Sequence, residues 1–156
     1  MKIVVIGSVA AGTSVAAKAR RNTEDAEIVI YDRDRDISYS GCGLPYYVGG
    51  EVDDIEDLRP CDSAWFAKRS HVAIHTRHEV THVDHAARTV TVHRLDSAET
   101  LTDTYDVLVL ATGVSSIVPP IPGGGSAGVF TLRSPSDAEE IRAFADRCQP
   151  ERAVIV

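Results

Sequence analysis

The chain has 156 residues, with 16 lysines and arginines against 23 aspartates and glutamates, and a formal net charge of -7. This length suits one domain of ordinary size, whose core needs neither disulfides nor a structural metal. The charges are mixed along the chain without a basic stripe, which argues against binding to nucleic acid or to an anionic membrane surface. We therefore expect small-molecule partners.

The cysteines and the N-terminus indicate where the protein works. Cys42, Cys61 and Cys148 are odd in number and irregularly spaced, unlike the disulfide framework of a secreted protein. The apolar run at residues 3–6 ends at Gly7, far short of a signal peptide or a membrane span. These features predict a cytoplasmic protein with at least one free thiol.

The first 32 residues predict a βαβ unit. Residues 2–6 are apolar and β-branched, as in a strand covered on both faces, and a glycine turn then opens an alanine-rich helix that runs to Arg21. Residues 26–31 repeat the strand pattern. Two parallel strands joined by a helix are the usual start of a nucleotide-binding fold.

The glycine turn reads Gly-Ser-Val-Ala-Ala-Gly from Gly7 to Gly12, so that Val9 stands where G-x-G-x-x-G has its middle glycine. Alone, this is a weak signal. Asp32 lies 20 residues after Gly12, at the end of the second strand, where a carboxylate can accept hydrogen bonds from both ribose hydroxyls of an adenosine. Together they favour an adenine dinucleotide site, although a plain turn and a solvated Asp32 remain the alternative.

The rest of the chain predicts further elements. A helix is expected over residues 58–69, and a small antiparallel meander from strands at 72–74, 80–83 and 89–92, with a turn at 84–88. A buried strand over 105–110 ends at Ala111-Thr112-Gly113, and a proline- and glycine-rich loop covers 118–125.

The C-terminal part predicts a helix over 137–147, with Ser136 as its N-cap and Glu139 at capping-box spacing. Residues 152–156 read as a new apolar strand. We therefore expect one domain over residues 1–150 and, over residues 151–156, the first strand of a second domain that is otherwise absent.

The segment 38–50 is the most informative, since one thiol is flanked by small residues in Gly41-Cys42-Gly43. A reactive cysteine must be accessible, and its thiolate is favoured by nearby N–H dipoles, as at a helix start. This segment resembles the pyridine nucleotide-disulfide oxidoreductases. The same resemblance extends to the glycine turn, Asp32, His78-Glu79-Val80, Ala111-Thr112-Gly113 and residues 132–145. Within that family the chain resembles the single-cysteine group of coenzyme A disulfide reductases, NADH oxidases and NADH peroxidases.

The resemblance implies an α/β fold, with a Rossmann-like FAD-binding domain of parallel sheet and helices plus an antiparallel β meander. It implies that residues 1–150 are the FAD-binding domain and that residues 151–156 are the first strand of a truncated NAD(P)H-binding domain. It implies FAD as cofactor, NAD(P)H as electron donor and Cys42 as the catalytic thiol. The residues that it places at the cofactor are Gly7, Ala10, Ala11, Gly12, Asp32, Arg33, Val80, Ala111, Thr112 and Gly113. The residues that it places at a coenzyme A substrate are Ser14, Lys18, Arg21, Ser38 and Gly41. Gly41 stands where some members have asparagine, which weakens the coenzyme A assignment.

This chain lacks a second cysteine near Cys42 and a histidine in the glycine turn, and both absences narrow the range of activities that we expect. The positions that would complete a C-x4-C pair are Ile37 and Tyr47, so Cys42 has no local partner. Ala10 replaces the histidine that peroxidase and oxidase members carry in the turn, which favours thiol over oxygen chemistry. The resemblance thus implies that NAD(P)H reduces FAD and that the electrons reach a disulfide held on Cys42. The substrate would be coenzyme A disulfide, or a related disulfide or persulfide.

Other interpretations stay open. The chain could be an FAD-binding module without turnover, because in the family the NAD(P)H domain begins where this chain ends and the domain that makes the family homodimeric comes later. An NADH oxidase and an NAD-dependent dehydrogenase are further alternatives. The histidines lie in strand-like sequence, where their spacing does not converge on a metal, so no metal is expected. Cys61 and Cys148 are expected to be buried, and Arg20 and Arg21 could be a solvated helix end.

Overall fold

The computed structural model describes residues 1–156, which form two compact units. The first, here called the sheet unit, comprises Met1–Tyr39 and Arg59–Gly113. The second, here called the cysteine unit, comprises Ser40–Leu58 and Val114–Val156.

The sheet unit contains a four-stranded parallel sheet in the order β3-β2-β1-β7. Its strands are β1 (Lys2–Ile6), β2 (Glu27–Tyr31), β3 (Ala73–His75) and β7 (Val107–Leu110). The helix α1 (Ala10–Asn22) crosses from β1 to β2, as the βαβ prediction requires. A second sheet is antiparallel, in the order β4-β5-β6, from β4 (His78–Asp84), β5 (Thr89–Arg94) and β6 (Thr100–Thr104).

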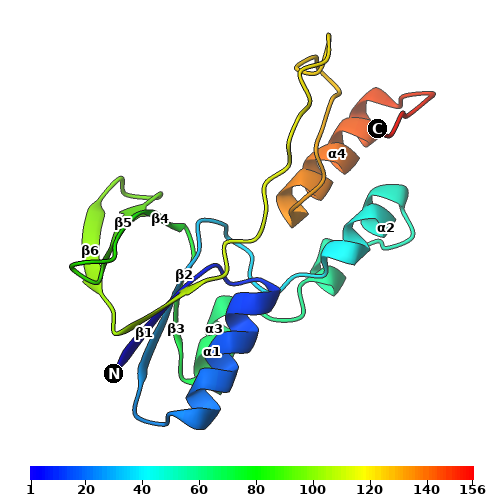
Figure 1. The fold of residues 1–156 in the computed structure, drawn as a ribbon. Helices are drawn as coiled ribbons and strands as arrows, with labels where there is room; N and C mark the ends of the chain where they lie inside the picture. Colours follow the sequence, from blue (N-terminus) through cyan, green and yellow to red (C-terminus); the bar gives the residue numbers. More distant parts are fainter. The chain divides into compact units, whose positions relative to one another are not determined.

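The parallel sheet is covered on both faces. Side chains of alternate residues on β1 point to opposite sides, so that Ile3 and Val5 pack with α1 and α3 (Ser63–Ser70), while Val4 packs with the antiparallel sheet. Figure 1 shows α1 and α3 on one side of the parallel sheet and β4–β6 on the other. The expected fold class is therefore confirmed: a Rossmann-like α/β layer arrangement with a separate antiparallel sheet.

A polar cluster links the two sheets. The Tyr31 hydroxyl donates to Asp103 Oδ2 at 2.8 Å, and Lys2 Nζ donates to Asp103 Oδ1 at 2.6 Å. Burial opposes ionisation of Asp103, but the hydrogen bonds from Lys2 and Tyr31 outweigh it and hold the pKa of Asp103 below its ordinary value. Burial, together with the hydrogen bond to Asp103, raises the pKa of the Tyr31 hydroxyl. The ionised Asp103 thus ties β6 to β1 and β2.

The expected meander differs from the observed one at both ends. Residues 73–75 pair in parallel with β2 and belong to the first sheet, whereas the third strand of the antiparallel sheet is β6, which the sequence did not predict. The side chains of β6 alternate between partly buried and exposed, and most of them are polar, so its apolar signal is weak.

Two further expectations, one for a helix and one for a strand, are wrong. The helix predicted over 58–69 is not continuous, because the 3-10 helix η2 (Ile55–Leu58) ends at Leu58 and α3 begins only after Asp62. The Asp62 side chain caps α3 by accepting from Trp65 N at 2.7 Å. Pro60 lies in the gap and cannot donate a helical hydrogen bond. The strand predicted as buried, β7, lies at the sheet edge, where Val107 is 42% and Leu110 69% exposed.

The cysteine unit contains the short helices η1 (Gly41–Gly43), α2 (Leu44–Gly49) and η2, and the longer α4 (Pro135–Cys148). The N-cap of α4 is Ser134 rather than Ser136, and its capping-box partner is Asp137 rather than Glu139. Pro135 fixes this start, because proline suits the first helical position. Residues 118–125 form no helix or strand, as expected for the proline- and glycine-rich loop.

Two expectations at the C-terminus are not met. No strand forms over 152–156, where Val154 and Ile155 are 87% and 97% exposed, because no neighbouring strand pairs with it. Cys148, expected to be buried, is exposed at the end of α4, whereas Cys61 packs against the core beside α3. No helix is long and apolar enough to cross a membrane.

Candidate cofactor and thiol sites

The turn between β1 and α1 is shaped by its glycines. Gly7 has φ +100°, and a Cβ there would overlap the carbonyl oxygen of Ala111, while a Cβ at Gly12 would overlap the carbonyl oxygen of Gly7. Ala111 N donates to Ile6 O at 2.8 Å, which fixes the end of β7 beside this turn. The structure thus brings the Gly7–Gly12 turn and Ala111-Thr112-Gly113 together at the carboxyl ends of adjacent parallel strands, where nucleotides bind in folds of this kind.

The N-terminus of α1 is suited to a phosphate. Val9 occupies the N-cap position without a side-chain cap, and no acidic residue lies in the first turn. Ala10 and Ala11 are exposed, so no large side chain covers the first-turn amides. Free N–H groups at the start of a helix, together with the helix dipole, attract anionic oxygens.

Asp32 follows β2 and is buried, with 7% exposure, so it is not the solvated strand end of the alternative interpretation. Its Oδ2 accepts from both the amide and the hydroxyl of Ser8, each at 2.6 Å, and its Oδ1 accepts from Asp34 N at 2.9 Å. A carboxylate offers about four acceptor positions. One position therefore remains for a ligand hydroxyl, and rotation of the Ser8 hydroxyl would release a second.

Ser8 is the site residue that the sequence analysis missed. It is fully buried, and its side chain serves Asp32. A small polar residue directly after the first glycine of such a turn, with an acid at the end of the next strand, is the signal that could have identified it.

The remaining cofactor candidates lie in the same unit. Arg33 is exposed directly after Asp32, and the Asp32 carbonyl accepts from His78 N at 2.8 Å, which brings the start of β4 to the end of β2. Val80 lies on β4, an edge strand whose pairing with β5 shifts between Val80 and His82. An edge strand leaves backbone groups unpaired on one side, as a backbone contact to an adenine requires.

The candidate substrate residues on α1 share one face. Ser14, Lys18 and Arg21 are spaced four and three residues apart, and all three are exposed. Arg20 has a different role, because its guanidinium donates to Glu24 O at 2.5 Å and His71 O at 2.7 Å at the end of α1. Arg21 is therefore the free cation at this helix end, while Arg20 is structural.

Ser38 and Gly41 belong to different units. Ser38 is partly buried in the sheet unit, with φ 51°, while Gly41 begins η1 in the cysteine unit and is exposed.

Cys42 is exposed in the middle of η1, and α2 follows without a break, so the thiol lies at the start of a helical segment. Ser40 N donates to Leu58 O at 2.8 Å and Gly43 N donates to Ser40 O at 3.0 Å. A Cβ at Gly43 would overlap the Leu58 side chain. Small residues beside Cys42 therefore let this turn pack against η2 while the thiol stays accessible.

All three cysteines are free, and no three histidine, cysteine, aspartate or glutamate side chains are grouped closely enough to hold a metal ion. Cys42 and Cys148 are exposed, whereas Cys61 is partly buried.

Comparison with known proteins agrees with this arrangement. The coenzyme A disulfide reductase of Staphylococcus haemolyticus is 36% identical over 99% of this chain and 34% of its own length. The structure of reduced CoADR-RHD from Bacillus anthracis has a TM-score of 0.93 and 39% identity, over 96% of this chain and 27% of that one. An NAD-dependent persulfide reductase from A. fulgidus has a TM-score of 0.89 and 37% identity, over 94% of this chain and 28% of that one.

The chain thus spans about a third of the length of the curated relatives that it matches. The family described as pyridine nucleotide-disulphide oxidoreductase matches residues 1–156. The chain belongs to the pyridine nucleotide-disulphide oxidoreductase family.

Proposed function

We propose that this chain is the FAD-binding part of an NAD(P)H-dependent disulfide reductase in which Cys42 is the only redox thiol. The observation that carries the proposal is the exposed Cys42 at the start of the η1–α2 segment, with no second cysteine at C-x4-C spacing. The similarity of the chain to a coenzyme A disulfide reductase and to a persulfide reductase supports the same thiol–disulfide chemistry.

The residues present fit FAD. The uncapped N-terminus of α1, at Ala10 and Ala11, would hold the pyrophosphate, and Asp32 would accept from the adenosine ribose, with Arg33 beside it. The Val80 backbone would meet the adenine, and Ala111-Thr112-Gly113 would pass along the cofactor beside Gly7. When bound, FAD would supply the two-electron transfer between NAD(P)H and the thiol site.

The proposed role of Cys42 is thiol–disulfide exchange. Its thiolate attacks one sulfur of the substrate, a new S–S bond forms, and the other substrate sulfur leaves as a thiolate. The resulting mixed disulfide needs two electrons and one or two protons to release the second thiol, and NAD(P)H is the reductant. The exposed face of Ser14, Lys18 and Arg21 on α1 is a proposed substrate contact, and its two cations suit the phosphates of coenzyme A disulfide. Ser38 and Gly41, each in its own unit, are further proposed substrate residues.

Ala10 also bears on the choice of substrate. Peroxide or oxygen reduction in the family uses a histidine in the glycine turn, and a methyl side chain at Ala10 cannot transfer a proton. The proposal therefore prefers a disulfide or persulfide to oxygen.

The test is the visible spectrum of the purified chain titrated with FAD, before and after stepwise reduction, for the wild type, Cys42→Ser and Cys148→Ser. Cys148 is also exposed and serves as the matched control. We expect bound FAD in all three proteins and a long-wavelength thiolate-to-flavin charge-transfer band that only Cys42→Ser loses. Bound FAD without the band in the wild type would indicate a flavin module with an idle thiol, and absence of FAD binding would contradict the cofactor assignment.

A further inference from the structure

Two histidines hold the backbone of Asp32, the proposed ribose acceptor. The Asp32 amide donates to the carbonyl oxygen of His75 at 3.0 Å, and the His78 amide donates to the Asp32 carbonyl oxygen at 2.8 Å. His75 ends β3 and His78 begins β4, with a two-residue turn between them in which Arg77 has φ 59°. A left-handed backbone is strained in a residue other than glycine, so this turn needs further contacts to keep its shape.

The side chains of the same two histidines supply such contacts. The Tyr31 ring lies 5.4 Å from the His75 ring and 6.3 Å from the His78 ring, measured between centroids. The two histidine rings are 5.3 Å apart. The Tyr31 hydroxyl is fixed in turn by its hydrogen bond to Asp103. Three rings from β2, β3 and β4 therefore pack together where β2 reaches Asp32.

The hydrogen bonds of the His78 ring define its protonation state. Its Nδ1 lies 2.7 Å from the carbonyl oxygen of Thr76, and a carbonyl oxygen can only accept, so Nδ1 carries the hydrogen. Its Nε2 lies 3.3 Å from Arg94 Nε, which can only donate, so Nε2 carries a lone pair. The His78 ring is therefore uncharged in this arrangement. A second ring proton would remove the bond from Arg94 and place two cations against each other.

The surroundings of His75 also oppose a positive charge. His75 lies on an edge strand in contact with solvent, but packing against Tyr31 removes water from one face of its ring. This burial, followed by the charges of His78 and Arg94, outweighs the attraction of Asp103 and lowers the pKa of His75 below its ordinary value.

The acids around the two histidines are already engaged. Lys2 pairs with Glu27 at 3.0 Å and with Asp103 at 2.6 Å, and Arg94 pairs with Glu99 at 2.8 Å. The charged and titratable groups that act on the histidine rings and on Tyr31 thus come from β1, β2, β5, β6 and the turn before β6: Lys2, Glu27, Tyr31, Arg94, Glu99 and Asp103. None of these acids is left over to balance a charge on the histidines.

We propose that His75 and His78 are positioning residues for Asp32, and that they hold it only while both rings are uncharged. The inference rests on the proposed FAD site. A proton on His78 breaks the bond from Arg94, and a proton on His75 adds a positive charge to the same cluster, so either change loosens the turn between β3 and β4. This turn leads to the amide that binds the Asp32 carbonyl, and Val80, the proposed adenine contact, follows two residues later. Both adenosine contacts should therefore weaken in acid.

The first test needs no cofactor. Urea denaturation of the 156-residue chain at several pH values compares wild type with His75→Phe, which keeps a ring against Tyr31 and removes the titrating nitrogens. Because the pKa of His75 is lowered in the folded state, its uncharged ring contributes stability above the ordinary histidine value of about 6.5, and this is lost as pH falls below it. The free energy of unfolding of His75→Phe should therefore rise relative to wild type as pH falls from about 7.5 to about 5.5.

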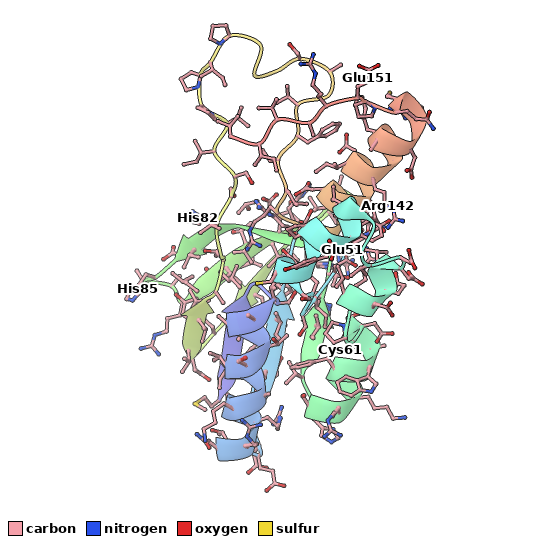
Figure 2. All side chains as sticks on the ribbon, turned by 90° about the vertical axis from the view of Figure 1, so that its right-hand side faces the viewer. Glu51, Cys61, His82, His85, Arg142 and Glu151 are labelled. Carbon is pink, nitrogen blue, oxygen red and sulfur yellow. The ribbon has the colours of Figure 1, made fainter.

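The matched control is His85→Phe. His85 is an exposed histidine of the same unit, in the turn between β4 and β5. Figure 2 shows it at the outer end of the antiparallel sheet, projecting away from the ribbon. The difference in free energy of unfolding between His85→Phe and wild type should stay constant over the same pH range.

The second test is the dissociation constant of FAD, followed by quenching of flavin fluorescence. For wild type it should rise about threefold to tenfold between about pH 7.5 and about pH 5.5. His75→Phe should bind FAD as tightly as wild type at the higher pH and lose at least half of this rise. His78→Phe should bind more weakly at every pH, because both hydrogen bonds of the ring are lost, and His78→Asn, which keeps a donor for the Thr76 carbonyl, should recover part of the affinity.

The inference is overturned if His75→Phe follows wild type at every pH in urea, or if its FAD affinity falls with pH as steeply as that of wild type. A hydrogen on Nε2 rather than Nδ1 of His78, measured from the carbon-13 chemical shift of Cδ2 in the chain without FAD, also overturns it, whether or not His78→Phe folds. The proposed function fails separately, when the wild-type chain does not bind FAD at neutral pH. The denaturation series then still decides whether the rings must be uncharged.

Discussion

The sheet unit and the cysteine unit are held together in different ways. In the sheet unit both faces of the parallel sheet are covered, and Val4, Val5 and Ile30 have no exposed surface. In the cysteine unit large apolar side chains remain in solvent, including Val114 at 71% and Ile117 at 90%. The first unit is therefore ordered by burial of apolar surface, whereas the second depends more on directional contacts such as the α4 capping box and the hydrogen bonds that Arg142 donates to the carbonyl oxygens of Tyr47 and Val52.

The difference suits the two proposed tasks. A dinucleotide site needs fixed backbone geometry, which a close-packed core supplies at Gly7 and Asp32. A thiol that exchanges with substrate disulfides must stay accessible, and a segment with few buried side chains keeps Cys42 exposed.

The largest expected effect is on the free energy of unfolding, when an isoleucine is truncated to alanine in the sheet unit. The same truncation in the cysteine unit is the comparison. Ile30→Ala removes a side chain with no exposed surface and leaves a cavity, and should lower the free energy of unfolding by about 2–5 kcal/mol. Ile117→Ala, at 90% exposure, should change it by less than about 0.5 kcal/mol. Urea denaturation followed by circular dichroism measures both, and similar losses would contradict the contrast between the units.

A smaller effect is expected from the polar link between the sheets. Asp103→Asn removes the charge that accepts from Lys2 and Tyr31, and should cost about 2 kcal/mol at neutral pH. Because the pKa of Asp103 is lowered in the folded state, its stabilisation is present above the ordinary aspartate value of about 3.9 and is lost as pH falls through the folded value.

The free energies of unfolding of wild type and Asp103→Asn should therefore converge as the pH falls below the ordinary aspartate value of about 3.9. Asp96→Asn is the control, because Asp96 also pairs with an arginine, Arg77 at 3.2 Å, but is 73% exposed. It should cost less than about 0.5 kcal/mol. A difference between wild type and Asp103→Asn that does not depend on pH would exclude the ionised Asp103 as its source.

The smallest effect is local to the cysteine unit. Ser134→Ala removes the N-cap of α4 and should destabilise that helix by about 1 kcal/mol, seen as faster hydrogen exchange of its first-turn amides. Ser136→Ala, two residues later and exposed, should leave the exchange unchanged. Equal effects of the two substitutions would show that Ser134 is not the cap.

Local patterns in the sequence were sufficient to predict the first βαβ unit of the sheet unit. The strand at 2–6, the turn and the helix to Arg21 are neighbours in the chain, so their apolar runs and glycines predicted them within a residue or two. The helix start at Cys42 was predicted for the same reason, from small residues on both sides of one thiol.

Pairing between distant segments could not be predicted in the same way. Residues 73–75 alternate as a meander strand would, yet their partner is β2, more than 40 residues earlier in the chain. Ser8 was missed because its partner, Asp32, is brought to it only by the fold. A serine near a glycine turn has no distinctive local pattern.

Asp32, the proposed ribose acceptor, shows how the fold can fix the orientation of a polar side chain. Three donors, two from Ser8 and one from Asp34, hold its two oxygens through contacts within the chain itself. The rotamer freedom of this side chain is therefore lost during folding rather than during association. A hydroxyl-bearing ligand that reaches Asp32 meets an acceptor of fixed orientation, and the entropy cost of ordering that side chain does not reduce its affinity.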